Sequence, residues 1–185
     1  MKINNTSLSG VMIIEPKVFG DNRGYFYESF QETRYTEIGI TLPFVQDNAS
    51  RSSKNVLRGL HHQQKHTQGK LIYVTRGTVF DVAVDIRVGS PTFGRWTSVI
   101  LDDIDHRQLY IPPGFAHGFC VLSETADFFY KCTDFYDPAS EITVQWNDPD
   151  IGIKWPISTP ALSAKDAKGK LLKDFTENEL PKYAK

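Results

Sequence analysis

Cysteine, net charge and long apolar stretches are all scarce in this sequence of 185 residues. Its two cysteines, Cys120 and Cys132, each lie inside an apolar run rather than in a metal-binding or redox pair. We therefore expect two buried free thiols. Lys and Arg number 21 and Asp and Glu number 22, so the formal net charge is -1. This balance argues against a nucleic-acid partner, which usually requires a basic face.

The apolar runs are also too short for a membrane span, and residues 79–84 (VFDVAV) are a typical example. The first ten residues, MKINNTSLSG, lack the apolar core of a secretory signal. We therefore expect a cytoplasmic protein without a membrane partner. A chain of 185 residues that is 40% hydrophobic can bury one sizeable core, which predicts a single domain over residues 1–185.

Short β-branched and aromatic runs recur along the chain, separated by Gly, Pro, Asn and Asp. They occupy residues 11–19, 25–30, 56–63, 70–77, 78–87, 96–101, 108–114, 118–122, 127–136 and 141–146. Such spacing predicts an all-β sandwich or barrel. One helix is expected from Gln31 to Ile38, because Gly39 is suited to end it. Short helical turns are expected outside the barrel between Ser163, a candidate N-cap, and about Leu172.

Histidine is the residue type that most clearly points to chemistry. The chain has five histidines, of which His61, His62 and His66 are clustered and His117 ends the sequence Pro-Pro-Gly-Phe-Ala-His. That last spacing resembles the second signature of the cupin superfamily, whose jelly-roll barrels often hold a metal. A cupin metal site needs H-x-H, because strand side chains alternate between faces. His61 and His62 are adjacent, so only one can point inward, and we expect the barrel without the metal.

Tyrosine supplies a possible acid to pair with a histidine base. Alternation places Tyr130 on the same strand face as Phe128 and Cys132, and Tyr136 follows six residues later. Buried tyrosines often serve only as core residues with a tethered hydroxyl, and a single histidine can equally be a surface or hydrogen-bonded core residue. Histidine titrates near neutral pH, however, and tyrosine can offer a proton from another direction. The pair is therefore a candidate acid–base system.

Longer motifs then identify a family. They lie at residues 51–61, 68–70, 80–87, 90–94, 114–119 and 146–149, and the likeness extends from Arg23 to Asp166. In sequence and order they closely resemble the dTDP-4-dehydrorhamnose 3,5-epimerases. The resemblance implies a cupin-fold homodimer without metal or cofactor, which acts in the route to dTDP-L-rhamnose, a precursor of bacterial surface polysaccharide such as O-antigen. The absence of a G-x-G-x-x-G or P-loop motif agrees with the lack of a cofactor.

The resemblance also assigns roles to residues of this chain. It implies that His61 is the base, Asp166 its hydrogen-bond partner, Lys70 the group that holds the sugar oxyanion and Tyr130 the proton donor on the opposite face. His62 stands where the family commonly has an aromatic residue. Nucleotide and sugar contacts fall on Arg23, Glu28, Gln46, Asn48, Arg58, His117, Tyr136, Glu141 and Lys165. For each of these the ordinary alternative is a surface pair or a strand hydrogen bond.

Two geometric expectations follow. Arg58 and His61 are three residues apart, so a regular strand would place them on opposite faces. If both enter the site, the strand must be irregular near Gly59. Arg23 and Glu28 lie in an early segment that resembles the arm exchanged between subunits in this family. We therefore expect each site to be completed by the partner chain.

The implied reaction starts from dTDP-4-dehydro-6-deoxy-D-glucose, whose C4 ketone acidifies the hydrogens on C3 and C5. Removal of either hydrogen gives an enolate, and return of a proton from the other face inverts the carbon. Three alternatives remain open at this stage. They are a mono-epimerase acting at C3 or C5 only, a metal-dependent cupin isomerase or dioxygenase, and a sugar-binding jelly-roll module without catalysis.

Overall fold

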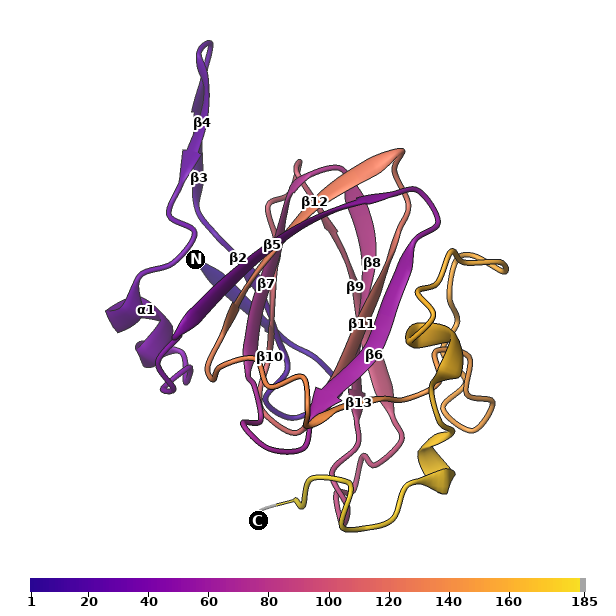
Figure 1. Ribbon diagram of the computed structural model, residues 1–185. Helices are drawn as coiled ribbons and strands as arrows, with labels where there is room; N and C mark the ends of the chain where they lie inside the picture. Colours follow the sequence, from indigo (N-terminus) through magenta and orange to yellow (C-terminus); the bar gives the residue numbers. More distant parts are fainter. Residues whose placement is uncertain (184–185) are drawn as a thin grey trace.

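The computed structural model describes residues 1–183 and shows two antiparallel sheets that face each other as a barrel (Figure 1). The first sheet has the order β1 (Lys2–Asn5), β2 (Met12–Glu15), β10 (Gln108–Ile111), β7 (Lys70–Arg76), β12 (Thr125–Cys132) and β5 (Gln46–Ser53). The second has the order β13 (Glu141–Thr143), β6 (Leu57–Gln63), β11 (Phe115–Val121), β8 (Thr78–Asp85) and β9 (Trp96–Asp102). The predicted all-β jelly roll is confirmed. The single domain predicted over residues 1–185 stays a prediction, and residues 184–185 lie outside the described part.

Alternation along the strands builds the core between the two sheets. Ile72 of β7 and Phe128 of β12 pack there against Val79 of β8 and Phe119 of β11. Leu71, the neighbour of Ile72, points to the outer face of its sheet. Because apolar side chains fill one part of the interior, polar inward residues are confined to the remainder, where the site lies.

The outer faces of the two sheets are covered by different segments. Helix α1 (Glu32–Glu37) buries Tyr35 against the first sheet. The side chain of Gln31 caps this helix and Gly39 follows its end with φ 98°, so the predicted helix is confirmed. The C-terminal segment lies beside β6 and buries Leu172 and Phe175 over the second sheet (Figure 1).

The predicted turns after Ser163 are two short 3₁₀ helices, η1 (Asp166–Lys168) and η2 (Leu172–Asp174). They begin later than expected, but the Ser163 hydroxyl accepts a hydrogen bond from the Asp166 backbone N–H at 3.1 Å. Cys120 and Cys132 are buried free thiols, as predicted. Among residues 1–183, no helix is long and apolar enough to span a membrane.

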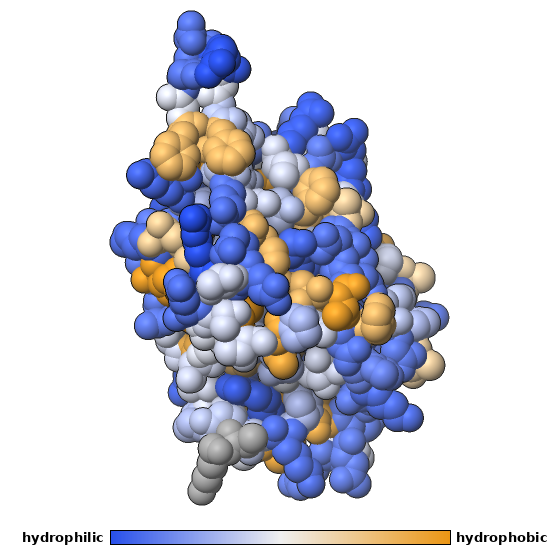
Figure 2. All heavy atoms as spheres, turned by 90° about the vertical axis from the view of Figure 1, so that its left-hand side faces the viewer, coloured by the Kyte–Doolittle hydropathy of each residue, from blue (hydrophilic) through white to orange (hydrophobic). Residues whose placement is uncertain are grey.

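A hairpin of β3 (Val18–Asp21) and β4 (Gly24–Tyr27) projects away from the barrel (Figure 1). Phe19 is 53% exposed and Phe26 is 68% exposed, and Figure 2 shows apolar side chains below a hydrophilic tip. Near the barrel, the rings of Tyr25 and Tyr27 lie 4.3 and 4.8 Å from the ring of His106. We call residues 18–27 the arm.

Candidate active site

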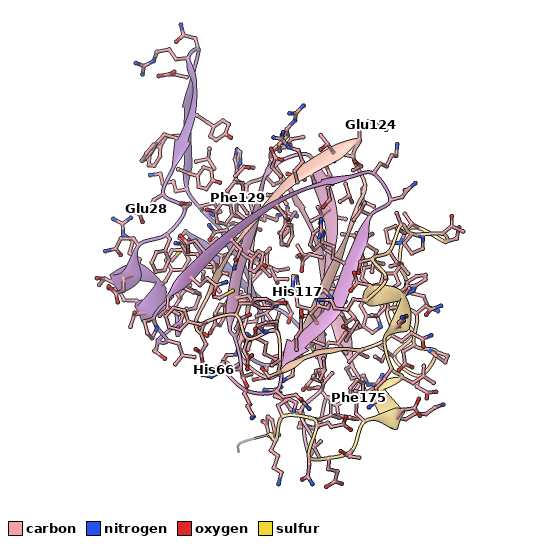
Figure 3. The ribbon with its side chains drawn as sticks, in the orientation of Figure 1. Glu28, His66, His117, Glu124, Phe129 and Phe175 are labelled. Carbon is pink, nitrogen blue, oxygen red and sulfur yellow. The ribbon has the colours of Figure 1, made fainter. Side chains whose placement is uncertain are left out.

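A cavity of about 230 Å³ opens between the two sheets at the end that apolar side chains leave free. Figure 3 shows His117 of β11 pointing into the space between the sheets. All of the lining residues are polar or aromatic. They are Ser50, Arg58, His61, Lys70, His117, Phe119, Phe128, Tyr130, Tyr136, Glu141 and Lys165. The structure thus gathers most of the predicted site residues around one cavity.

An irregularity of β6 brings Arg58 and His61 to the same side of the strand. Gly59 has φ 116°, and the pairing of β6 with β11 shifts register at this point. A Cβ atom on Gly59 would lie 2.6 Å from the Gly118 Cα and from the His117 carbonyl oxygen, so only glycine fits. The irregular strand predicted near Gly59 is confirmed.

His61 is held by a buried carboxylate. Its Nε2 lies 2.5 Å from Oδ1 of Asp166, and Oδ2 of Asp166 accepts a hydrogen bond from the Ser163 hydroxyl at 2.8 Å. Burial raises the pKa of Asp166, but the hydrogen bonds from His61 and Ser163 outweigh it and leave that pKa below its usual range. An ionised Asp166 only accepts hydrogen bonds, so Nε2 of His61 carries the proton. Nδ1 is then left with a lone pair, the form that a base requires.

His62 is directed away from the cavity lining. It is 4% exposed, and its Nδ1 lies 3.2 Å from the Phe115 carbonyl oxygen. Burial lowers the pKa of His62 to about 4, so the ring is neutral at neutral pH. This environment suits an aromatic ring, as the resemblance implies for this position. Within residues 1–183, no group of three or more His, Cys, Asp or Glu side chains is placed to hold a metal ion.

Lys70 and Tyr130 face His61 from the opposite sheet. The Lys70 ammonium lies 5.9 Å from the centre of the Tyr130 ring and has no ion-pair partner among residues 1–183. Burial lowers the pKa of Lys70, and the nearby Cys132 and Glu141 only partly offset this effect. Burial also raises the pKa of Tyr130 to about 12, which keeps its phenol protonated. The cavity therefore has an imidazole, the candidate base, on one wall, and a phenol and a lysine, the candidate acid and cation, on the other.

Three further predicted residues form a cluster at the cavity rim. Oε2 of Glu141 accepts hydrogen bonds from the Lys165 ammonium at 2.8 Å and from the Tyr136 hydroxyl at 2.9 Å. Oε1 of Glu141 lies 3.7 Å from Nδ1 of His61. The cluster thus places a carboxylate beside the unprotonated nitrogen of His61.

Asp81 is a residue that the sequence analysis did not select. Its carboxylate lies 2.9 and 3.1 Å from Nε2 of His117, inside the second sheet. Burial raises the pKa of Asp81 and outweighs the attraction of His117, which acts to lower it. Burial also lowers the pKa of His117, so it opposes the charged form of both groups. The signal in the sequence that could have identified Asp81 is its position as a single carboxylate within the apolar run of residues 79–84. Ser50 was also missed, although alternation along β5 places it with Gln46 and Asn48.

Four predicted binding residues lie outside the cavity lining. Gln46 donates to Asn48 on β5 at 3.0 Å, and Asn48 contacts the Cys132 sulfur at 3.5 Å. Arg23 and Glu28 lie at the arm, paired with Asp21 and Arg34 at 2.6 and 2.8 Å. Arg23 lies on the arm and Glu28 directly follows it, and neither lines the cavity of its own chain.

A second cavity of about 470 Å³ adjoins the first and shares Arg58, His61 and Lys165 with it. Its other lining residues are Val56, Leu57, Ala161, Leu162, Ser163 and Asp166. Arg58 and Lys165 therefore place positive charge along both cavities, where an anionic group attached to a sugar could be met.

Comparison with known proteins agrees with this arrangement. The family model for dTDP-4-dehydrorhamnose 3,5-epimerase matches residues 5–174. The Salmonella typhimurium protein of that name is 56% identical over 93% of this chain and 96% of its own length. A Legionella pneumophila dTDP-6-deoxy-D-glucose-3,5-epimerase, solved with dTDP-4-keto-L-rhamnose, superposes with a TM-score of 0.98 at 57% identity, covering 100% and 99% of the two chains. A dTDP-4-dehydrorhamnose 3-epimerase from Streptomyces niveus is 40% identical over 100% of this chain and 90% of its own. The chain therefore belongs to the dTDP-4-dehydrorhamnose 3,5-epimerase family.

Proposed function

We propose that this chain inverts C3 and C5 of dTDP-4-dehydro-6-deoxy-D-glucose and releases dTDP-4-dehydro-L-rhamnose. The observation that carries the proposal is the placement of His61 and Tyr130 on opposite walls of one cavity, with Lys70 beside Tyr130. Inversion requires a base and an acid on different faces of the sugar. A site with both groups on one wall would return the proton where it left.

The first step is removal of a proton from carbon by Nδ1 of His61. Asp166, held ionised by its hydrogen bonds, stabilises the imidazolium that forms. The electrons move to the C4 oxygen, where Lys70 faces the negative charge. Because burial makes an isolated Lys70 charge costly, the ammonium gains most when an anion develops next to it.

The second step is protonation from Tyr130 on the other face. Its phenol remains protonated until the strongly basic enolate carbon approaches it. His117, Tyr136 and Glu141 surround the remaining sugar oxygens, while Arg58 and Lys165 meet the diphosphate. The net change is stereochemical and needs no redox cofactor.

We also propose that the protein is a homodimer whose sites are completed by the partner chain. The exposed aromatic arm and the position of Arg23 and Glu28 away from their own cavity support this assembly. Gln46 and Asn48, at the edge of the cavity, would join them in holding the nucleoside. Mixing inactive Arg23→Ala with inactive His61→Asn protein under exchange conditions should restore activity, since one site then collects neither defect. No recovery in proven heterodimers would mean that each site is built from one chain.

We place the enzyme in the cytoplasm, in the synthesis of dTDP-L-rhamnose for surface polysaccharide such as O-antigen. Cys120 and Cys132 are free thiols, the state that a reducing compartment maintains. Neither a nucleic acid nor a membrane is part of the proposal, because the chain carries almost balanced charge.

Inversion at C3 alone is the second candidate, because the Streptomyces niveus relative carries that name. Incubation with dTDP-4-dehydro-6-deoxy-D-glucose in heavy water separates the two. Deuterium at both C3 and C5 with inversion at both is expected for the double epimerase. Inversion and label at one carbon only would establish a mono-epimerase, and no label at either carbon would overturn both.

A further inference from the structure

Each inversion leaves a proton on His61, because the hydrogen removed from carbon and the hydrogen returned to it use different residues. Two inversions in one binding event therefore require His61 to lose its first proton before it takes a second. That proton is on Nδ1, since Nε2 is held by Asp166. The site must provide a route from Nδ1 to solvent, a requirement that rests on the proposed function.

Glu141 is the ionisable group beside Nδ1. Its Oε1 lies 3.7 Å away, too far for a hydrogen bond to a neutral ring but close enough to attract the imidazolium. The Glu141 side chain is 12% exposed, so it connects the interior to the rim. In the pairing of β13 with β6, Glu141 lies opposite Gln63 and Thr143 lies opposite His61, so the sheet holds Glu141 diagonally across from His61.

The other carboxylate oxygen of Glu141 is tied to the rim. Lys165 and Tyr136 donate to it, and each is 51% exposed. Burial raises the pKa of Glu141, but Lys165, His61 and Tyr136 together hold that pKa below its usual range. Glu141 is therefore ionised and ready to accept a proton, and an acid with a low pKa keeps that proton only briefly.

We propose that Glu141 is the proton exit of this site. Charge attraction draws the His61 imidazolium and Oε1 of Glu141 into hydrogen-bond contact, and the proton then passes from Nδ1 to Oε1, which leaves a neutral imidazole and a carboxylic acid. The acid then gives the proton to a water molecule at the rim and is again a carboxylate. Solvent returns one proton to Tyr130, so each inversion exchanges one hydrogen with water and no electrons change hands.

The alternative route runs through Asp166 and the Ser163 hydroxyl, which are hydrogen-bonded at 2.8 Å. Loss of the proton from Nε2 by that route would leave the other proton on Nδ1. The imidazole would then be the wrong tautomer, with no lone pair toward the sugar. A proton that leaves from Nδ1 restores the lone pair of that nitrogen directly, which favours the route through Glu141.

The test compares Glu141→Gln with Ser163→Ala, which interrupts the alternative route, and with Asp150→Asn, which removes a surface carboxylate paired to Lys173. In Glu141→Gln, we expect kcat for double inversion to fall by roughly 10²-fold, and the singly inverted sugar should accumulate. Added imidazole buffer should raise kcat in proportion to its concentration, because a small base can replace the lost carboxylate. Ser163→Ala and Asp150→Asn should show neither accumulation nor buffer dependence.

A purely substrate-binding role for Glu141 predicts a higher KM without buffer rescue, and that result would overturn the proposal. So would buffer rescue of Ser163→Ala instead. Glu141→Asp keeps a carboxylate, so it should need less buffer than Glu141→Gln, and equal thermal midpoints would exclude a folding defect. If the wild-type enzyme fails to invert both carbons, the proposed function is wrong. If it inverts both and Glu141→Gln gives an unchanged product pattern without rescue, only the proton exit is wrong.

Discussion

The site contains two histidine–carboxylate pairs whose histidines lie on neighbouring strands of the second sheet, and the pairs differ in their surroundings. His61 pairs in register with His117 across β6 and β11. The rim pair is His61 with Asp166, in which the histidine side chain is 23% exposed and the pKa of the carboxyl is lowered. The interior pair is His117 with Asp81, in which the histidine side chain is 9% exposed, the carboxylate is fully buried and the pKa of the carboxyl is raised.

The difference shows that environment rather than residue type assigns the roles. At the rim, hydrogen bonds keep Asp166 ionised, so an imidazolium on His61 gains a charged partner. In the interior, burial opposes charge on both His117 and Asp81, so this pair is suited to holding a neutral ring in one orientation. We therefore propose that the rim pair supplies the base and that the interior pair positions the substrate.

The largest expected effect tests that assignment directly. His61→Asn should lower turnover by roughly 10⁴-fold, because it removes the imidazole that takes the proton from carbon in the proposed mechanism. His117→Asn should mainly raise KM. His62→Phe is the matched control, since its ring is buried away from the cavity and it should retain activity. Steady-state kinetics on the three variants decide the matter, and equal losses in His61→Asn and His62→Phe would contradict the base assignment.

Tyr130→Phe sharpens the comparison by leaving the rim pair intact. His61 can still remove a proton and Lys70 can still hold the enolate, but no acid remains on the opposite face. Inversion should fall by roughly 10²- to 10⁴-fold, while exchange of hydrogen with heavy water at unchanged configuration should fall much less. Deuterium incorporation and product configuration, measured on the same samples, give both rates.

Equal loss of exchange and inversion in Tyr130→Phe would mean that the phenol acts earlier, in binding or in setting the base. Unchanged inversion would assign the acid to another group. Tyr136, whose hydroxyl is bonded to Glu141 at the rim, is the next candidate.

Replacement of the carboxylate by asparagine should lower kcat more at Asp166 than at Asp81. Asp166→Asn removes the charge that supports the imidazolium, and kcat should fall by roughly 10²-fold. Asp81→Asn keeps an oxygen that can accept from His117, so kcat should fall by less than about 10-fold. Comparison of kcat for the two variants checks this, and a larger loss in Asp81→Asn would reverse the roles of the pairs.

Local patterns in the sequence predicted much of this arrangement. The helix ending before Gly39 follows from capping preferences, and the irregular strand at Gly59 follows from requiring Arg58 and His61 on one face. The candidate base and acid came from the family motifs, and alternation already placed Tyr130 inward. Each of these inferences concerns one segment at a time.

What the sequence did not reveal depends on how distant strands meet. Asp81 lies in an apolar run, and its contact with His117 exists only because β8 and β11 are adjacent. The proximity of Glu141 to His61 likewise depends on the pairing of β13 with β6. Residue spacing along the chain does not indicate which strands become neighbours in the sheet.

The smallest expected effect concerns the pH dependence of stability and involves His62. This histidine is buried without a carboxylate partner among residues 1–183, so it serves as the reference for the two histidine–carboxylate pairs. Its pKa falls from 6.5 to about 4 on folding, chiefly through burial. The unfolded chain therefore binds a proton as pH falls through 6.5, whereas the folded chain binds it only near pH 4. Stability is thus fully present above pH 6.5 and is lost as pH falls toward 4, by about 2 kcal/mol between pH 7 and pH 5.

His62→Phe removes this titration and keeps an aromatic ring in the same place. Urea unfolding of both proteins at pH 7 and pH 5, at equal protein concentration, measures the effect. The variant should lose about 2 kcal/mol less than the wild type between the two pH values, because every other titrating group is shared and cancels in the difference. Identical pH dependence would mean that His62 accepts a proton within the folded barrel. Burial without a carboxylate would then not suppress the charge of a histidine here, and the contrast between the rim and interior pairs would need another cause.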